Sequence, residues 1–185
     1  MEFTFILQCL WFFLPAYVAN MAPPIAAHFG ILEFLNKPVD FGKKFFDKEI
    51  LGSHKTWRGL IVGVCAGFAT YFVQARLYEK SDFFASVSIL DYQNINPWLF
   101  GILIPLGALC GDMIFSFFKR QLNIAPGESW MPFDQTDYVF GVMIFTAPFL
   151  NFEIRFWIWL LFLTFVLHIL CNRFGYWLKI SKSEW

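Results

Sequence analysis

Five apolar stretches, separated by polar segments, dominate the pattern of hydrophobic and polar positions. They run from Phe3 to Met21, Trp57 to Leu77, Trp98 to Phe118, Tyr138 to Phe152 and Phe156 to Leu178. Crossing a hydrocarbon core of about 30 Å takes roughly 20 helical residues, and backbone polar groups in lipid must pair within their own segment. The pattern therefore predicts an all-α integral membrane protein with about five transmembrane helices.

Prolines are expected to determine where two of these helices end. The first stretch is interrupted by Pro15 and followed by the Pro23-Pro24 pair, so we expect its helix to end near Met21. The apolar piece that follows, from Ile25 to Leu35, is too short to span and is predicted to be re-entrant or interfacial. The fourth stretch contains Pro148, which leaves little length for a spanning helix.

Composition agrees with this class. Apolar residues make up 58% of the chain and charged residues 15%, whereas a soluble domain carries about a quarter charged residues. The 185 residues are expected to form a single transmembrane domain, residues 1–185. The formal net charge is zero, so total charge points to no particular partner, and we expect no nucleic-acid partner.

The basic residues are distributed unevenly between the loops. Of the 14 Lys and Arg residues, 11 fall on one side of the predicted membrane: Lys37, Lys43, Lys44, Lys48, Lys55, Arg58, Lys119, Arg120, Arg173, Lys179 and Lys182. Because cytoplasmic loops carry the excess of Lys and Arg, we predict a multi-pass cell-membrane protein whose N-terminus lies outside. Both basic loops and the C-terminus are then cytoplasmic.

Glycines recur at four-residue spacing on two predicted helices. Gly59, Gly63 and Gly67 share one face of the second span, and Gly107 and Gly111 share a face of the third. Close contact between helices is the usual role of such spacing. The bare face of the second span is also expected to offer a groove for lipid tails.

The first cluster of candidate functional residues closes the loop before the second span. It contains Gly52, Ser53, Lys55, Thr56 and Arg58. Helix N-termini offer free N–H groups to phosphate, and the two basic residues add formal charge. The alternative is structural, with Ser53 as the helix N-cap and Lys55 and Arg58 as anchors at the membrane boundary. Residue types alone leave both interpretations open.

The second cluster centres on Asp112, inside the third predicted span. An ionisable residue there costs about 2.5–3.5 kcal/mol on insertion scales and is a functional candidate for that reason. Ser116 and Lys119 follow at i+4 and i+7, so the three share one helical face, and Arg120 comes next in the chain. The alternative is that Asp112 pairs with a basic neighbour for packing only.

The third cluster is a pair of carboxylates, Asp134 and Asp137, at the start of the fourth span. Magnesium prefers a few carboxylates combined with phosphate oxygens, so both are candidate Mg²⁺ ligands together with Asp112. The rival interpretation is a capping box, with Asp134 as N-cap and Asp137 as its partner. The presence of Asp112 and two basic clusters favours the metal role.

Together the clusters combine carboxylates for a divalent cation with at least four cations beside a lipid phase. That combination suits phosphoryl or nucleotidyl transfer onto a membrane-embedded phosphate, in a site formed by cytoplasmic loops. A small ion transporter or channel accounts for Asp112 but not for the other two clusters, and a non-catalytic scaffold accounts for none. His168 lies in an apolar stretch and is expected to be a core or interface residue.

Three ordered motifs resemble those of the CDP-archaeol synthases, a family of the CTP:phosphatidate cytidylyltransferase superfamily. They are Gly52-x-x-Lys55-Thr56-x-Arg58-Gly59, Gly111-Asp112-x-x-x-Ser116-x-x-Lys119-Arg120, and Pro126-Gly127 with Asp134-Gln135-x-Asp137. The bacterial-type phosphatidate enzymes carry a Lys-Asp pair and a Gly-His-Gly-Gly stretch after the Lys-Arg pair of the second motif. Residues 121–133 contain neither, which favours the archaeal type over a CDP-diacylglycerol synthase.

The resemblance implies a reaction and a set of roles. CTP and 2,3-bis-O-geranylgeranylglycerol 1-phosphate, a membrane lipid phosphate, would give the CDP-activated lipid and pyrophosphate, with Mg²⁺ as cofactor. The residues implied as catalytic are Asp112, Lys119, Arg120, Asp134 and Asp137, of which the three Asp would serve the metal. Those implied for substrate binding are Lys55, Arg58 and Ser116, together with Gly52, Thr56 and Gly127, which would shape the loops.

Overall fold

Helices make up most of the part of the chain that this computed structural model describes, residues 2–125 and 128–177. In chain order the elements are α1 (Glu2–His28), η1 (Glu33–Leu35, a 3₁₀ turn), β1 (Lys44–Phe45), β2 (Lys48–Glu49), α2 (Trp57–Lys80), α3 (Asp82–Ser86), α4 (Pro97–Gln121), η2 (Phe133–Gln135, a 3₁₀ turn), α5 (Asp137–Thr146) and α6 (Ile154–Trp177). Helices α1, α2, α4 and α6 are long and apolar enough to cross a membrane. The predicted all-α membrane fold is confirmed.

Two helices differ in length from the sequence prediction. α1 continues through Pro15 and both later prolines to His28, so the expected end near Met21 is wrong; neighbouring helices can compensate for the backbone bonds that proline removes. α5 ends at Thr146, because Pro148 has no N–H with which to extend it. Its ten residues measure about 15 Å, which is half the thickness of a hydrocarbon core. The predicted position of the fourth helix is therefore confirmed, but the helix is too short to span the membrane.

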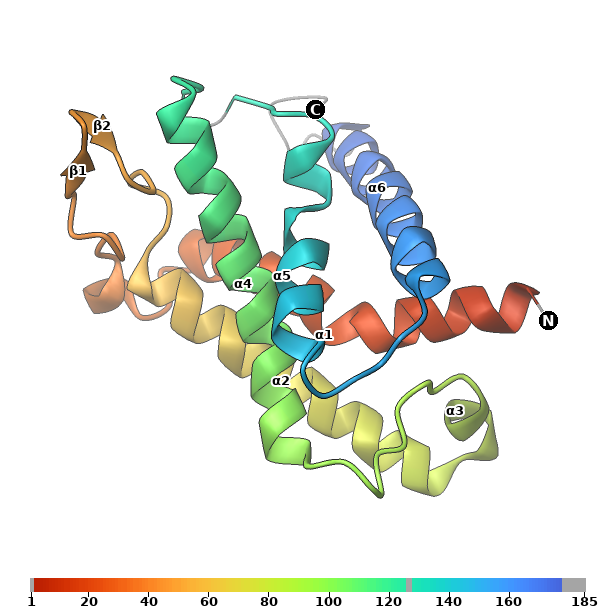
Figure 1. Ribbon diagram of the computed structural model, residues 1–185. Coiled ribbons are helices and arrows are strands. Elements are labelled where there is room, and N and C mark those ends of the chain that lie inside the picture. The colour runs from red at the N-terminus through yellow and green to blue at the C-terminus, as the bar shows by residue number, and fades with distance from the viewer. Residues whose placement is uncertain (1, 126–127, 178–185) are drawn as a thin grey trace.

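Glycines set the distances between the long helices. α1 packs along α2, and α4 packs on α2 (Figure 1). A Cβ added at Gly63 would lie 2.7 Å from the carbonyl oxygen of Ala19, and one at Gly67 would lie 2.4 Å from Cβ of Pro105. The predicted role of these glycines in helix contact is confirmed. The same contacts fill the face of α2 at Gly63 and Gly67, so the lipid groove expected there is wrong at these two positions, whereas Gly59 lines a cavity.

The contact of α4 with α5 positions the polar residues of both helices. A Cβ at Gly141 would lie 2.0 Å from the carbonyl oxygen of Gly107, and one at Gly111 would lie 2.5 Å from that of Asp137. Only glycine allows two backbones to approach in this way. The approach brings the start of α5, with Asp137, against the turn of α4 that carries Asp112.

Replacing Gly141 with Ala is expected to lower the stability of the detergent-solubilised protein by about 1–3 kcal/mol, the usual range for overpacking. The added Cβ meets backbone, which cannot move aside as a side chain can. Gly101→Ala is the matched control, because its Cβ would lie 3.2–3.4 Å from atoms of Phe68 and Tyr71 side chains. Thermal unfolding of both variants measures the effect, and equal melting temperatures would contradict the packing argument.

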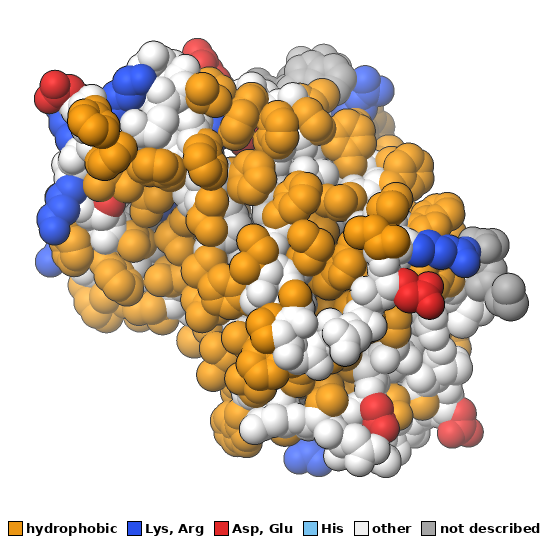
Figure 2. Space-filling model, viewed as in Figure 1, with side chains coloured by type: hydrophobic (Ala, Val, Ile, Leu, Met, Phe, Trp, Pro, Cys, Tyr) orange, Lys and Arg blue, Asp and Glu red, His pale blue; other side chains and the backbone are white. Residues whose placement is uncertain are grey.

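Apolar side chains also cover the outside of the helices. Ile114 on α4, Ile144 on α5 and Phe162 on α6 are exposed by 46%, 60% and 58%. Figure 2 shows hydrophobic side chains across the middle of one face, with most charged side chains near its margins. A continuous apolar surface of this extent is covered by lipid rather than water, which agrees with a multi-pass membrane protein.

Candidate active site

Gly52 directs the loop that leads into α2. Its φ is +89°, in the region that favours glycine, and it is buried. A Cβ at this position would lie 3.3 Å from Oε2 of Glu49 and 3.8 Å from Cδ of Arg120. The absence of a side chain therefore lets the loop pass close to Arg120 of α4, as a loop-shaping role requires.

The start of α2 is capped by Thr56. Its backbone is extended, and its Oγ1 accepts a hydrogen bond from the backbone N of Gly59 at 3.2 Å. The N-cap expected at Ser53 is therefore wrong, and Ser53 instead lies exposed in the wall of a cavity. Thr56 thus fixes the first turn of α2, which carries Arg58.

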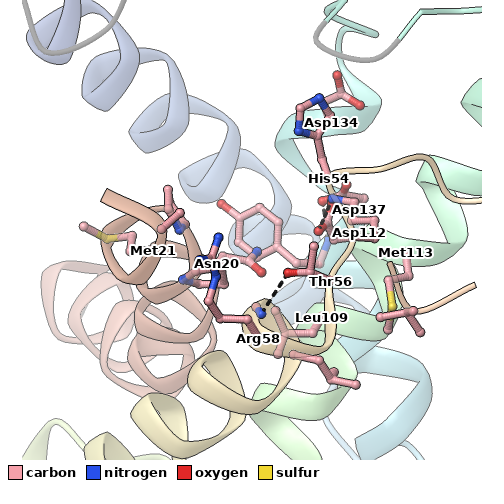
Figure 3. Close-up of a pocket in the computed structure, with 18 of the residues that line it drawn as sticks. Asn20, Met21, His54, Thr56, Arg58, Leu109, Asp112, Met113, Asp134 and Asp137 are labelled. Atoms are coloured by element: carbon pink, nitrogen blue, oxygen red, sulfur yellow. Dashed lines mark hydrogen bonds and ion pairs between the residues drawn. The ribbon is translucent and has the colours of Figure 1, made fainter. Parts of the chain in front are cut away.

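Lys55 and Asp112 form an ion pair between the loop and α4. Nζ of Lys55 donates to Oδ1 of Asp112 at 2.7 Å and to Oδ2 at 2.5 Å. The two side chains remain 24% and 31% exposed, and both line the cavities described below. The pairing of Asp112 with a basic neighbour therefore occurs, but at a cavity wall rather than in sealed packing. Figure 3 shows Asp112 beside Asp137 in this wall.

Arg58 is buried in the first turn of α2. Its guanidinium forms an ion pair with Glu33 of η1, whose side chain is largely exposed. Arg58 also lines the larger of the two cavities. The ion pair with Glu33, whose side chain faces outward, therefore fixes the guanidinium of Arg58 at the cavity wall.

The C-terminal end of α4 contributes Ser116, Lys119 and Arg120, each 8% exposed. Nζ of Lys119 donates to Oδ2 of Asp134 at 2.6 Å and to the carbonyl oxygen of Glu128 at 2.7 Å. This ion pair connects α4 to η2. The i+4 and i+7 spacing predicted that Ser116 and Lys119 share a helix face with Asp112. In the structure all three side chains line the smaller of two cavities.

Neither carboxylate at the start of α5 acts as the predicted cap. Asp134 lies inside η2, Thr136 precedes α5, and Asp137 is the first helical residue. Oδ1 of Asp137 accepts a hydrogen bond from the backbone N of the next residue, Tyr138, at 2.7 Å. The capping box of Asp134 with Asp137 is therefore wrong.

Two cavities meet at these residues. The larger has a volume of about 1030 Å³ and walls that combine Arg58 with apolar side chains such as Met21, Leu109 and Leu167. The smaller, about 290 Å³, is lined largely by polar residues. The residues that line both are His54, Lys55, Asp112, Asp134, Asp137 and His168. The shared wall makes the two cavities parts of one site.

Sequence reasoning missed three residues of this site. His168 of α6 lines both cavities, although an apolar stretch surrounds it in the sequence. Asn20 of α1 lines the larger cavity, and Gln135, only 3% exposed, lines the smaller. Oδ1 of Asn20 and Oε1 of Gln135 are buried with no hydrogen-bond partner in the described part of the chain. For Gln135 the signal was available: a polar residue between two candidate metal ligands.

The three predicted metal ligands share the cavity wall but differ in their partners. Among the described residues, no three His, Cys, Asp or Glu side chains lie close enough together to hold a metal ion by themselves. Asp112 and Asp134 pair with lysines, whereas Asp137, 4% exposed, has no ion-pair partner within residues 2–125 and 128–177. Gly127, predicted to shape a loop, lies outside the described residues.

Comparison with known proteins places the chain in a family. The profile of the CarS-like family, CDP-archaeol synthase, matches residues 2–185. The chain belongs to the CDP-archaeol synthase family. Among curated family members, the CDP-archaeol synthase of Pyrococcus abyssi (strain GE5 / Orsay) is 32% identical over 181 residues, which cover 97% of this chain and 98% of the relative. That of Methanoregula boonei is 38% identical over 178 residues, covering 92% and 99%.

A solved structure agrees with this assignment. It is described as structural insight into an intramembrane enzyme for archaeal membrane lipids biosynthesis, and it matches with a TM-score of 0.70 at 29% identity. The match covers 90% of this chain and 94% of that structure. Membership of the CDP-archaeol synthase family confirms the predicted enzyme class, a membrane-bound cytidylyltransferase of lipid biosynthesis, over the transporter and scaffold interpretations.

Proposed function

We propose that this enzyme transfers the cytidylyl group of CTP to 2,3-bis-O-geranylgeranylglycerol 1-phosphate, with Mg²⁺ as cofactor. One observation carries the assignment of the nucleotide to the smaller cavity: Arg120 is buried there with Nε and Nη1 lacking any partner among the described residues. A buried guanidinium with two unpaired nitrogens is costly, and its fork matches phosphate oxygens. A bound triphosphate supplies those acceptors.

The reaction needs no protein nucleophile. A phosphate oxygen of the lipid attacks the α-phosphorus of CTP, a new P–O bond forms, and the bond between the α-phosphorus and its bridging oxygen breaks. The bridging oxygen leaves with pyrophosphate. Lys119 and Arg120 at the smaller cavity stabilise the negative charge that gathers on the leaving group, and Lys55, which lines both cavities, holds the two phosphates together.

The residues present fit a magnesium ion carried in with the nucleotide. Mg²⁺ binds through one or two carboxylates, water and substrate phosphates rather than in an all-protein cage. Asp137 is the best-placed ligand, since it is a buried carboxylate without an ion-pair partner in the described structure, and Asp112 and Asp134 stand in the same wall. When bound, Mg²⁺ would neutralise charge on the triphosphate and on the departing pyrophosphate.

The larger cavity suits the lipid phosphate. Arg58 supplies a cation for the phosphate, while Met21, Leu109 and Leu167 offer apolar walls to the glycerol and the first part of the tails. Apolar contacts discriminate poorly, because one methylene is worth only about 1–3 kcal/mol even in a closed pocket. The site therefore recognises the phosphate strongly and the tail chemistry weakly.

Purified enzyme with labelled CTP, Mg²⁺ and the isoprenoid ether lipid phosphate is expected to form CDP-lipid. Diacyl phosphatidic acid in matched micelles should give a lower but measurable initial rate, because it presents the same phosphate to Arg58. Omitting either CTP or lipid provides the baseline. A faster rate with phosphatidic acid would overturn the proposed acceptor, and no CDP-lipid from either acceptor would overturn the reaction itself.

We also propose that the site faces the cytoplasm, where CTP is available. The excess of Lys and Arg near the site supports this orientation. A cysteine at Lys37, in the loop before α2, should then be protected from a membrane-impermeant thiol reagent added to intact cells. A cysteine at Gln93, exposed between α3 and α4, should be labelled. The parent with its four native cysteines replaced is the blank, and the reverse labelling pattern would place the site outside.

A further inference from the structure

The β1–β2 hairpin projects beside the end of α4 (Figure 1). Its turn consists of Phe46 and Asp47, and Phe45 is the last residue of β1. Lys44 pairs with Glu49 and Phe45 with Lys48 across the hairpin. Phe45 is 47% exposed and Phe46, at the tip, is 83% exposed. None of the proposed steps of the reaction uses these side chains.

The tip holds Phe46 in a conformation that does not favour it. Phe46 and Asp47 both have positive φ, +48° and +62°, as in the two-residue turns where Asn-Gly is preferred. A bulky residue in this region is a backbone outlier. A large apolar side chain kept in a strained and outward-facing position indicates a partner outside the fold.

The hairpin extends the lipid-facing surface of α4. The ring centroids of Phe45 and Phe46 lie 4.5 Å apart, those of Phe45 and Phe117 5.9 Å, and those of Phe117 and Phe118 5.7 Å. Phe118, in the last turn of a helix long enough to span the membrane, is 49% exposed. We call these four residues, Phe45, Phe46, Phe117 and Phe118, the hairpin patch. It is continuous with the apolar surface that the bilayer already covers.

Cations border the hairpin patch. Lys43 and Lys44 precede Phe45 directly, and both are exposed. Figure 2 shows hydrophobic, basic and acidic side chains next to one another where Figure 1 places the hairpin. Apolar side chains such as Phe, when flanked by basic residues, bury into the boundary between headgroups and acyl chains, and lysines near the surface attract anionic headgroups.

We infer that the β1–β2 hairpin is a lipid-contacting element whose tip enters the headgroup layer of the membrane that the helices span. Phe46 lies at the interface, and Lys43 and Lys44 face anionic headgroups. The hairpin is also tied to the site, because Nζ of Lys48 donates to the carbonyl oxygen of Gln121 at 2.5 Å and β2 leads directly to Gly52. Lipid contact at the tip therefore helps to hold the site loop at headgroup level.

The test replaces Phe46 with the photocrosslinking residue p-benzoylphenylalanine in the full chain, reconstituted in vesicles of phosphatidylcholine and phosphatidylglycerol. Irradiation is expected to give protein–lipid adducts, detected by mass, in several-fold higher yield than the same residue at Gln93, an exposed position in a polar turn. Phosphatidylglycerol should be enriched among the adducts relative to its share of the vesicles. Adding Lys43→Ala and Lys44→Ala should remove that enrichment and leave the total yield.

Two results would overturn the inference. One is a lipid yield at Phe46 no higher than at Gln93, which would place the tip in water. The other is crosslinking of two copies of the chain in place of lipid, which would make the hairpin patch a protein interface. Both readouts are independent of catalysis, so an enzyme inactive with CTP would leave this test unaffected.

Discussion

Replacing Asp137 with Asn is expected to lower the turnover number by about 10²–10³-fold, as loss of one electrostatic stabiliser in an active site does, without unfolding the protein. Asp137 is 4% exposed and pairs with no cation in the described part of the chain. Asn keeps the shape and can still accept the hydrogen bond from N of Tyr138. What it loses is the negative charge, and with it the ability to hold Mg²⁺.

The stability of the variant separates a functional carboxylate from a structural one. Burying an unpaired charge destabilises a fold, so Asp137→Asn should unfold at the same or a higher temperature than the parent. The rate of CDP-lipid formation and the melting temperature in detergent are measured on the same preparation. Asp91→Asn is the matched control, since Asp91 is exposed and lies outside both cavities. Retention of full activity by Asp137→Asn would remove this residue from the proposed metal site.

Replacing Arg120 with Met is expected to lower kcat/KM for CTP by about 10²–10³-fold, the effect of truncating a buried, charge-assisted contact. The guanidinium has two nitrogens without partners among the described residues, so the change breaks few internal bonds. The free enzyme should therefore melt at the same or a higher temperature. The stabilisation that CTP gives to the parent, which grows with ligand concentration, should be lost.

Lys119→Met and Arg76→Met provide the contrast. Lys119 pairs with Asp134 at 2.6 Å, so its loss leaves a carboxylate unpaired and should lower the melting temperature even without CTP. Arg76 is 75% exposed on its side chain and lines neither cavity, so its replacement should change neither quantity. An Arg120→Met enzyme that keeps the parent's CTP-induced shift would show that the unpaired nitrogens do not bind the nucleotide.

The sequence identified the charged residues of the site because the membrane makes such residues conspicuous. Asp112 stands out in an apolar stretch, and the i+4 and i+7 spacing correctly placed Ser116 and Lys119 beside it at one cavity. His168 and Asn20 escaped the same reasoning. A histidine or asparagine in a helix is compatible with packing, and only the neighbouring helices decide whether it faces a cavity.

Local pattern also proved insufficient at both helix starts. Ser53 and Asp134 are good N-cap residue types, but Thr56 caps α2, and Asp134 lies within η2, where its Oδ2 accepts the backbone N of Trp130 at 2.8 Å. At each helix start, several residues that could serve as the N-cap follow one another in the sequence. Contacts with distant segments, such as the ion pair of Asp134 with Lys119, decide which of them caps the helix.

By itself, the sequence determined the membrane class, the positions of the helices and the inventory of charged groups, because hydropathy and helical spacing are local properties. The tertiary structure alone decided which of those groups meet. Lys55 reaches Asp112 across 57 positions, and Asp137 comes against α4 because Gly107, Gly111 and Gly141 let two backbones approach. It also left Nε and Nη1 of Arg120 without a hydrogen-bond partner in the described structure. Whether two charged groups pair in a low-dielectric site depends on distances of a few ångströms. Those distances are set by how the helices pack rather than by the order of residues in the chain.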